Sequence, residues 1–274
     1  MRKWLLVLTL LAAACQAQTS GGPPPTPGPT PTPLPPPVWA VVPDPAAGSG
    51  FAVTDGPHRV ALPKIKDLPP DIPPWRLAQV ADTDGDGRPE AIVQGYTGGA
   101  HCCFVYLVFE SRADGIRQVD GFNLGNAGIA QAADLDGDGR AELVGGDDRL
   151  AYFDDLPFAA SPFLPLILCR SDPGRFRDCT PKFPDRLQAE LDRAEAGLKE
   201  AVDGAAAGRL APETARFIQR SQALKVAALA VRLGRPDDGR ERVRRLCPEC
   251  LAWLDEHRAE LSGRLGSPVP RPWP

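Results

Sequence analysis

The chain contains the stretch Ala78-Gln-Val-Ala-Asp-Thr-Asp-Gly-Asp-Gly-Arg-Pro-Glu90 and repeats it 52 residues later as Ala130-Gln-Ala-Ala-Asp-Leu-Asp-Gly-Asp-Gly-Arg-Ala-Glu142. Ten of the thirteen positions are identical. The same step backwards reaches a proline-rich region, and the same step forwards reaches a sequence of helical character, so there are two copies. A repeat of this kind must be recognised first, because missing it leads to the wrong fold.

Each copy carries three aspartates at alternate positions. Three carboxylates within five residues repel one another unless a cation lies among them. A hard cation that takes six to eight oxygens fits this pattern, which favours Ca²⁺ over Mg²⁺. The glycines between the aspartates adopt positive φ at little cost and let the backbone curl around an ion. The aspartates are Asp82, Asp84 and Asp86 in the first copy and Asp134, Asp136 and Asp138 in the second.

Two further ligands per loop follow by analogy with other Asp-x-Asp-x-Asp loops. The backbone carbonyls of Arg88 and Arg140 stand at the seventh position, and the side chains of Glu90 and Glu142 stand at the ninth. An EF-hand is excluded because its loop needs a bidentate acid at position twelve, where this chain has Val93 and Gly145. Acidic surface turns without an ion are the alternative to calcium.

The sequence around the loops predicts strands. Residues 91–93, 102–109 and 143–144 are rich in β-branched and aromatic residues, and residues 39–42, 51–53, 59–62 and 150–153 are shorter candidates. Turns are expected at Gly98-Gly99, Gly121 and Asp147-Asp148. We therefore expect a β domain over residues 38–182.

The pattern Asp-x-Asp-Gly-Asp-Gly-x-x-Glu-hydrophobic resembles the calcium loop of FG-GAP (VCBS-type) repeats, which build the β-propellers of integrin α-subunits. The stretch Gly98-Gly-Ala-His-Cys-Cys103 also resembles a segment of uncharacterised bacterial proteins with such repeats. The resemblance covers about residues 75–155 and implies a structural calcium in each loop. A closed propeller needs about four to eight blades. Two copies therefore imply a partial propeller, a compact sandwich-like sheet pair, or a unit completed by oligomerisation.

Helical periodicity begins near Pro184. Apolar residues at helical spacing predict four helices over residues 183–265, with Asp185 and Asp238 as N-caps and a break at Pro248. We expect a small helical bundle, followed by a disordered proline-rich tail over residues 266–274. The predicted fold class is therefore α+β, with an all-β domain preceding the bundle.

The N-terminus predicts export. Arg2 and Lys3 precede an apolar run that is too short to span a bilayer and suits a signal peptide over residues 1–14. The run ends in Leu-Ala-Ala-Ala-Cys15, which resembles the lipobox of bacterial lipoproteins, although Leu11 lies one residue farther from the cysteine than usual. Lipidated Cys15 and a proline-rich spacer would occupy residues 15–37. An ordinary secreted protein is the alternative.

The location after export follows from the next residue. Gln16 is not the Asp that retains some lipoproteins at the inner membrane. This favours a membrane-anchored protein at the outer membrane or cell surface, on its periplasmic or external face.

Six cysteines remain after Cys15, and an even number in an exported chain predicts disulfides. We predict the local pairs Cys169–Cys179 and Cys247–Cys250, and the pairing of Cys102 and Cys103 stays open. Redox and metal roles for the Cys247-Pro-Glu-Cys250 motif are alternatives.

Function is the least specified property. The net charge is −4, and about −6 without Arg2 and Lys3, which argues against nucleic acid as a partner. No catalytic motif is present, so we expect no enzyme. The leading hypothesis is a membrane-anchored calcium-binding module with a protein or glycan ligand. An envelope scaffold that acts through the helical bundle, and a hydrolase with structural calcium, are the alternatives. The oligomeric state is left open.

Overall fold

The structure is a computed structural model of residues 1–274, and it describes residues 35–65, 74–98, 103–171 and 174–273. The chain divides into two units, residues 1–35 and 36–274. The predicted signal peptide, Cys15 and nearly all of the predicted spacer therefore lie outside the described residues. Every helix and strand among the described residues belongs to the second unit.

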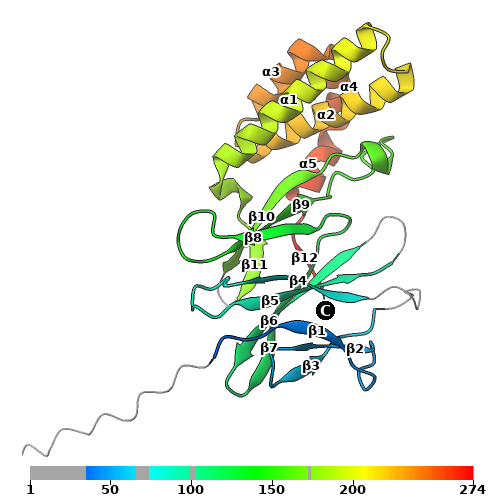
Figure 1. The fold of residues 1–274 in the computed structure, drawn as a ribbon. Helices are drawn as coiled ribbons and strands as arrows, with labels where there is room; N and C mark the ends of the chain where they lie inside the picture. Colours follow the sequence, from blue (N-terminus) through cyan, green and yellow to red (C-terminus); the bar gives the residue numbers. More distant parts are fainter. Residues whose placement is uncertain (1–34, 66–73, 99–102, 172–173, 274) are drawn as a thin grey trace, which may run out of the picture. The chain divides into compact units, whose positions relative to one another are not determined.

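Three antiparallel sheets form the first part of this unit (Figure 1). The first sheet contains β1 (Ala40–Pro43), β2 (Phe51–Thr54) and β3 (Arg59–Ala61). The second contains, in spatial order, β12 (Arg271–Pro272), β7 (Gly115–Asn123), β6 (Phe104–Arg112), β5 (Glu90–Tyr96) and β4 (Trp75–Ala81). The third contains β11 (Arg175–Asp178), β10 (Leu164–Ser171), β9 (Glu142–Asp147) and β8 (Ile129–Ala133).

The second sheet is covered on both faces because its strands are apolar at consecutive positions rather than at alternate ones. Ala91 and Val93 point into one core, which they share with Trp39 and Val53 of the first sheet and its flank. Ile92, between them in sequence, points into the other core. That second core also contains residues of the third sheet, namely Leu143, Leu166, Leu168 and Phe176. The three sheets are thus stacked face to face with the second in the middle.

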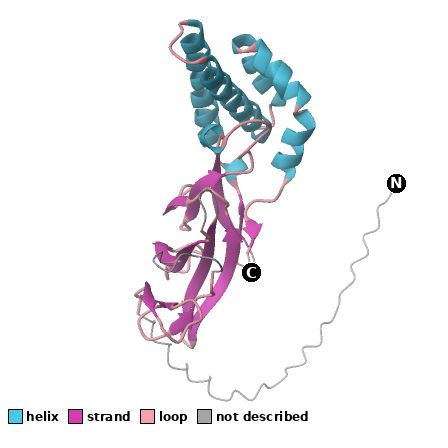
Figure 2. Ribbon diagram, turned by 90° about the vertical axis from the view of Figure 1, so that its right-hand side faces the viewer, coloured by secondary structure: helices cyan, strands magenta, loops and turns pink. Residues whose placement is uncertain are grey.

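Five helices follow the sheets: α1 (Pro184–Ala206), α2 (Pro212–Arg232), α3 (Pro236–Leu246), α4 (Pro248–Glu256) and α5 (Arg258–Gly266). They lie beyond the third sheet (Figure 1), and Figure 2 shows the helices gathered at one end of the strands. Their shared core includes Leu150, Phe153, Leu156 and Leu164 from the β part. The α+β class and the C-terminal position of the helices agree with the sequence prediction.

Prolines, rather than the predicted capping side chains, mark the helix starts. The N-cap of α1 is Phe183 and that of α3 is Arg235, and neither makes a side-chain capping hydrogen bond. The prediction of Asp185 and Asp238 as N-caps is therefore wrong, by two and three residues respectively. A proline at the first helical position needs no intrahelical N–H partner and has a fitting φ, so it begins a helix without a cap.

The break at Pro248 is confirmed, since α3 ends at Leu246 and α4 begins at Pro248. The single helix predicted after it is wrong. His257 leaves the helical conformation between α4 and α5. Its ring Nδ1 lies 2.8 Å from the carbonyl oxygen of Trp253, and its Nε2 lies 3.3 Å from an oxygen of Asp154. These tertiary contacts are invisible to a periodicity argument.

The predicted disordered tail is also wrong for the residues described. Arg271 and Pro272 pair with Asn123 and Phe122 of β7. Trp273 then packs edge-to-face on Trp75, with ring centroids 5.9 Å apart. A composition rich in proline does not prevent a short edge strand, because an edge strand needs few of its N–H groups for the ladder.

Two local predictions in the β part are also wrong. Residues 150–153 form turns instead of a strand, and Leu150 and Phe153 are buried against the helical bundle. Gly121 lies inside β7 instead of in a turn. A Cβ at this position would lie 3.0 Å from the carbonyl oxygen of Trp273, so the glycine makes room for the C-terminal strand.

The two predicted local disulfides, Cys169–Cys179 and Cys247–Cys250, are present. Cys103 is disulfide-bonded as well, whereas Cys102 lies outside the described residues. A disulfide at Cys247–Cys250 excludes a thiolate metal site there in this oxidised form.

Candidate metal centre

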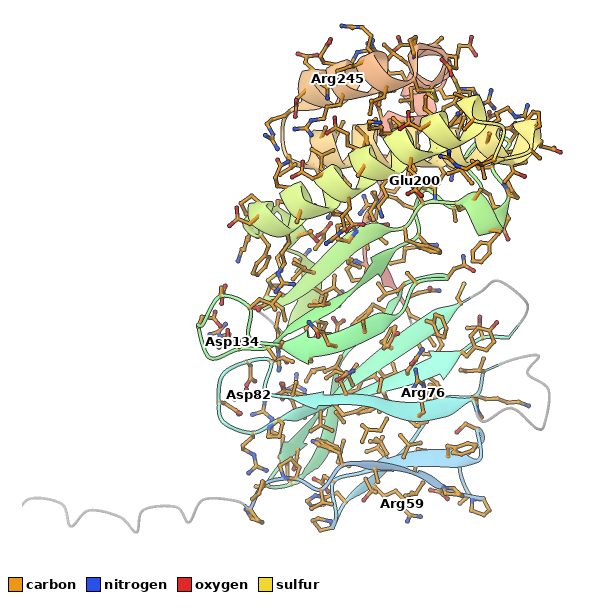
Figure 3. The ribbon with its side chains drawn as sticks, turned by 45° about the horizontal axis from the view of Figure 1, so that its top comes forward. Arg59, Arg76, Asp82, Asp134, Glu200 and Arg245 are labelled. Atoms are coloured by element: carbon orange, nitrogen blue, oxygen red, sulfur yellow. A yellow bond between two sulfur atoms is a disulfide. The ribbon has the colours of Figure 1, made fainter. Side chains whose placement is uncertain are left out.

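Both copies of the repeated motif form the connection within a β-hairpin: the first joins β4 to β5, and the second joins β8 to β9. Figure 3 shows Asp82 and Asp134, the first residues of the two loops, on the same side of the sheets. The first aspartate organises each turn. The two carboxylate oxygens of Asp82 accept hydrogen bonds from Gly85 N at 2.7 Å and Gly87 N at 2.8 Å.

The second loop repeats this arrangement with Asp134, Gly137 and Gly139, at 2.7 and 3.0 Å. All four glycines have φ between 78° and 86°. A residue with a Cβ is disfavoured in that conformation, so the glycine positions are required by the turn.

The ninth-position glutamates close the loops from the start of the following strand. Glu90 and Glu142 are both buried, and each accepts a hydrogen bond from the backbone of the second loop residue, Thr83 N at 2.7 Å and Leu135 N at 2.8 Å. One oxygen of each glutamate, Oε1, is left for another partner. Both glutamates thus lie at the base of their loops, and their role as metal ligands stays a prediction.

The distances between ligand atoms test whether a calcium ion fits. Oxygens bound to one Ca²⁺ at 2.3–2.6 Å lie at most about 5.2 Å apart. Asp82, Asp84 and Asp86 each offer an oxygen within 4.8 Å of the others, and so do Asp134, Asp136 and Glu142. Three of the five predicted ligands in each loop are thus close enough to share an ion, and the donor set is all oxygen. These distances allow one oxygen-bound cation in each loop, and its identity as calcium stays a prediction.

The first loop contains a cation from the protein itself. Arg170 of β10 is nearly buried, and its Nη1 lies 3.2 Å from Asp84 Oδ2 and 3.2 Å from Glu90 Oε1. Its Nη2 pairs with Glu110 of β6. Asp84, Glu90 and Glu110 also approach one another within 4.8 Å. The sequence analysis missed Arg170 and Glu110, and the only available signal was a charged residue at the end of an apolar run.

The second loop differs at this point. None of its four carboxylates makes an ion pair with a described residue, although Asp134, Asp136 and Glu142 lie together. Arg140, the seventh residue of the second loop, points toward the first loop instead. Its Cγ would lie 3.1 Å from a Cβ at Gly85 of that loop. Three acidic side chains, Asp134, Asp136 and Glu142, are thus gathered without a charged partner among the residues that the structure covers.

Burial changes the acidity of the inward-facing carboxyls. Burial raises the pKa of Glu90 and of Asp84 above the ordinary values, and Arg170 and hydrogen bonds offset this only in part. Burial likewise raises the pKa of Glu142, and the neighbouring aspartates add to the effect. Burial also acts on Glu110, but the hydrogen bonds from Arg112 and Arg170 outweigh it and lower its pKa.

The two loops touch each other. Ala141 N, in the second loop, donates a hydrogen bond of 2.7 Å to the carbonyl oxygen of Asp82, the first residue of the first loop. This contact joins the backbones of the two loops, which belong to adjacent sheets.

Comparisons with known proteins give limited information. No family model matches the chain, and no solved structure matches it. A probable thylakoid lumen protein of Synechocystis is 39% identical over 92 residues, which is 32% of this chain and 27% of that protein. An uncharacterized protein of Sinorhizobium fredii is 30% identical over 92 residues, which is 33% of this chain and 14% of that protein. The chain thus spans about a quarter or less of the length of these relatives.

In the described part of the chain, no helix is both long enough and apolar enough to cross a bilayer.

Proposed function

We propose that this chain is an exported, lipid-anchored protein whose two repeated loops each bind a calcium ion and thereby stiffen a β module that binds a protein or glycan ligand. The observation that carries the proposal is the second loop. Three of its carboxylates, those of Asp134, Asp136 and Glu142, converge without an ion pair from any described residue. Such a group is stable at neutral pH when a cation neutralises it, and calcium suits its all-oxygen donors.

The stacking of the sheets supports an FG-GAP-type blade arrangement. Strands β4–β7 and β8–β11 are each four sequential antiparallel strands with the calcium-type loop between the first two. Consecutive four-stranded sheets packed face to face are the repeating unit of a β-propeller. With the three-stranded sheet before them, they would make a partial propeller of three blades, which the helical bundle covers on the side of the third.

Three observations support a location outside the cytoplasm. The similar Synechocystis protein is described as a probable thylakoid lumen protein. The disulfides Cys169–Cys179 and Cys247–Cys250 are typical of oxidising compartments. The signal-peptide and lipobox pattern before Cys15 adds the membrane anchor. Labelling with a radioactive fatty acid tests the anchor: the wild-type chain should be labelled, and Cys15→Ala should not.

Calorimetric titration of the purified chain with calcium tests the metal sites. We expect saturable binding of two ions, and the loss of one site each in Asp84→Ala and Asp136→Ala. Extracellular-type sites bind at about 10⁻⁴–10⁻³ M, so the titration should extend to several millimolar. Asp114→Ala, an exposed turn variant between β6 and β7, is a control that should keep both sites. Absence of binding by the wild-type chain would refute the calcium function.

A further inference from the structure

A pocket of about 280 Å³ opens beside the first loop, where β6, β7 and β10 meet. Six charged residues line it: Arg112, Arg117, Arg140, Arg170, Asp84 and Glu110. They come from three separate strands and from both repeated loops. The pocket is therefore a product of the tertiary fold, and no stretch of sequence indicates it.

Two of the arginines are held in place by the acids. Glu110 pairs with both Arg112 and Arg170, and Arg170 also reaches Asp84 at 3.2 Å. A Cβ at Gly174 would lie 3.5 Å from the guanidinium of Arg170, which places this glycine against one wall. This half of the pocket is a rigid, internally compensated network.

The other two arginines have no such compensation. The guanidinium groups of Arg117 and Arg140 make no hydrogen bond or ion pair with any described residue, yet both line the pocket. Arg140 reaches it by crossing from the second loop over Gly85 of the first. Single unpaired arginines are common on surfaces. Here two of them converge on one concavity that already contains two more.

The charge of the lining identifies the class of ligand. Four guanidinium groups and two carboxylates line the pocket, and Glu90 behind the lining also pairs with Arg170, which leaves a net charge of +1 and both Arg117 and Arg140 without an ion pair. We propose that this pocket binds a dianionic oxyanion group, a phosphate monoester or a sulfate, through Arg117 and Arg140. Guanidinium groups donate paired N–H bonds that match such oxygens, and a phosphate monoester carries about −1.5 to −2 charges at pH 7. The lining contains no aromatic ring on which a neutral sugar would stack.

This inference does not rest on calcium binding, because the positive charge of the pocket arises from the protein alone. Calcium in the first loop would neutralise Asp84, which faces the same pocket, and would strengthen anion binding. The two properties can therefore fail independently, and the experiment separates them.

The test is a titration of the full mature chain, in EDTA, with inorganic phosphate, inorganic sulfate and acetate, followed by calorimetry. We expect saturable binding of phosphate and sulfate, and much weaker binding of monoanionic acetate. Arg117→Gln and Arg140→Gln should each weaken sulfate binding by about tenfold or more, since each removes charge-assisted hydrogen bonds. Sulfate titration in millimolar calcium should then show tighter binding than in EDTA.

Arg76→Gln is the matched control. Arg76 is an exposed arginine on β4 that Figure 3 shows well away from Asp82, so its loss lowers the net charge equally without touching the pocket. Because Arg117 and Arg140 are exposed and unpaired, their variants should keep the wild-type melting temperature. The proposal is overturned if the wild-type chain binds neither anion saturably, or if Arg76→Gln weakens binding as much as Arg117→Gln does.

Discussion

Arg170 of β10 reaches Glu90, the ninth residue of the first loop, with 3.2 Å between Nη1 and Oε1. The second loop has no equivalent cation from any residue that the structure covers. The two loops, nearly identical in sequence, are thus electrostatically different. A calcium ion in the first loop must compete with a guanidinium for Asp84 and Glu90, whereas an ion in the second loop meets uncompensated carboxylates.

The two calcium sites should therefore differ in affinity. Asp84→Ala leaves the second loop intact, and Asp136→Ala leaves the first. We expect the site that remains in Asp84→Ala to bind calcium at least about tenfold more tightly than the site that remains in Asp136→Ala. This corresponds to a difference in binding free energy of about 1.4 kcal/mol. Calorimetry on the two variants measures it. Equal affinities would show that Arg170 does not compete with the ion.

Removal of Arg170 should make the stability of the chain depend on calcium. Arg170→Gln leaves Asp84, Glu90 and Glu110 without their buried partner, and breaking a buried pair costs about 3–5 kcal/mol. For a domain of this size, that lowers the melting temperature in EDTA by about 6–20 °C. Calcium should restore part of the loss.

Arg175→Gln, an exposed variant on β11, should change the melting temperature little and serves as the control. A calcium-induced rise in melting temperature that is no larger in Arg170→Gln than in the wild-type chain would contradict the competition between the guanidinium and the ion.

Asp55 should make the first sheet sensitive to acid. Burial opposes ionisation of its carboxylate, but hydrogen bonds from Ser111 Oγ at 2.7 Å and His58 N at 2.9 Å outweigh this and lower its pKa below 3.8. The folded state therefore binds this proton less readily than the unfolded state does. The resulting stability is present above about pH 4 and is lost as the pH falls through the folded pKa.

Asp55→Asn tests this directly. The variant should be less stable than the wild-type chain at pH 7, by about 1–2 kcal/mol. This difference in the free energy of unfolding should shrink as the pH falls below about 4. It is lost as the pH passes through the lowered pKa of the folded wild-type carboxylate, which then becomes protonated. Urea unfolding at several pH values measures it, and a difference that does not depend on pH would contradict the role of the ionised carboxylate.

The C-terminal strand should contribute to stability. Trp273 packs on Trp75 and donates its backbone N–H to the Gly121 carbonyl at 3.1 Å. Trp273→Ala removes the aromatic contact and should lower the free energy of unfolding by about 1–3 kcal/mol. Val80→Ala, exposed on β4, should cost far less. Equal unfolding midpoints for Trp273→Ala and the wild-type chain would show that the tail is not docked.

The part of the fold that follows from local sequence was predictable. The β-then-α order, the hairpin loops, the helix break at Pro248 and the two local disulfides all depend on residues close together in the chain. The features that were missed depend on distant residues. Docking of Trp273 on Trp75 joins segments about 200 residues apart, and the turns at residues 150–153 are fixed by burial of Leu150 and Phe153 against the helices.

The same distinction applies to the site. The aspartates and glutamates of each loop lie within nine residues, so their spacing alone predicts that they gather. Arg170 and Glu110 come to the first loop from β10 and β6, and Arg140 crosses to the other loop's pocket. No periodicity or motif in the sequence predicts such contacts. These contacts are what makes the two copies differ.

A crystal structure of the mature chain grown in millimolar calcium, with anomalous diffraction collected at long wavelength, tests the calcium sites most directly. We predict an anomalous peak in the second loop, bound by Asp134, Asp136, Asp138, the Arg140 carbonyl and Glu142. A second, weaker peak should lie in the first loop, with Arg170 displaced from Asp84. Well-ordered loops without a peak at either position would contradict the calcium function.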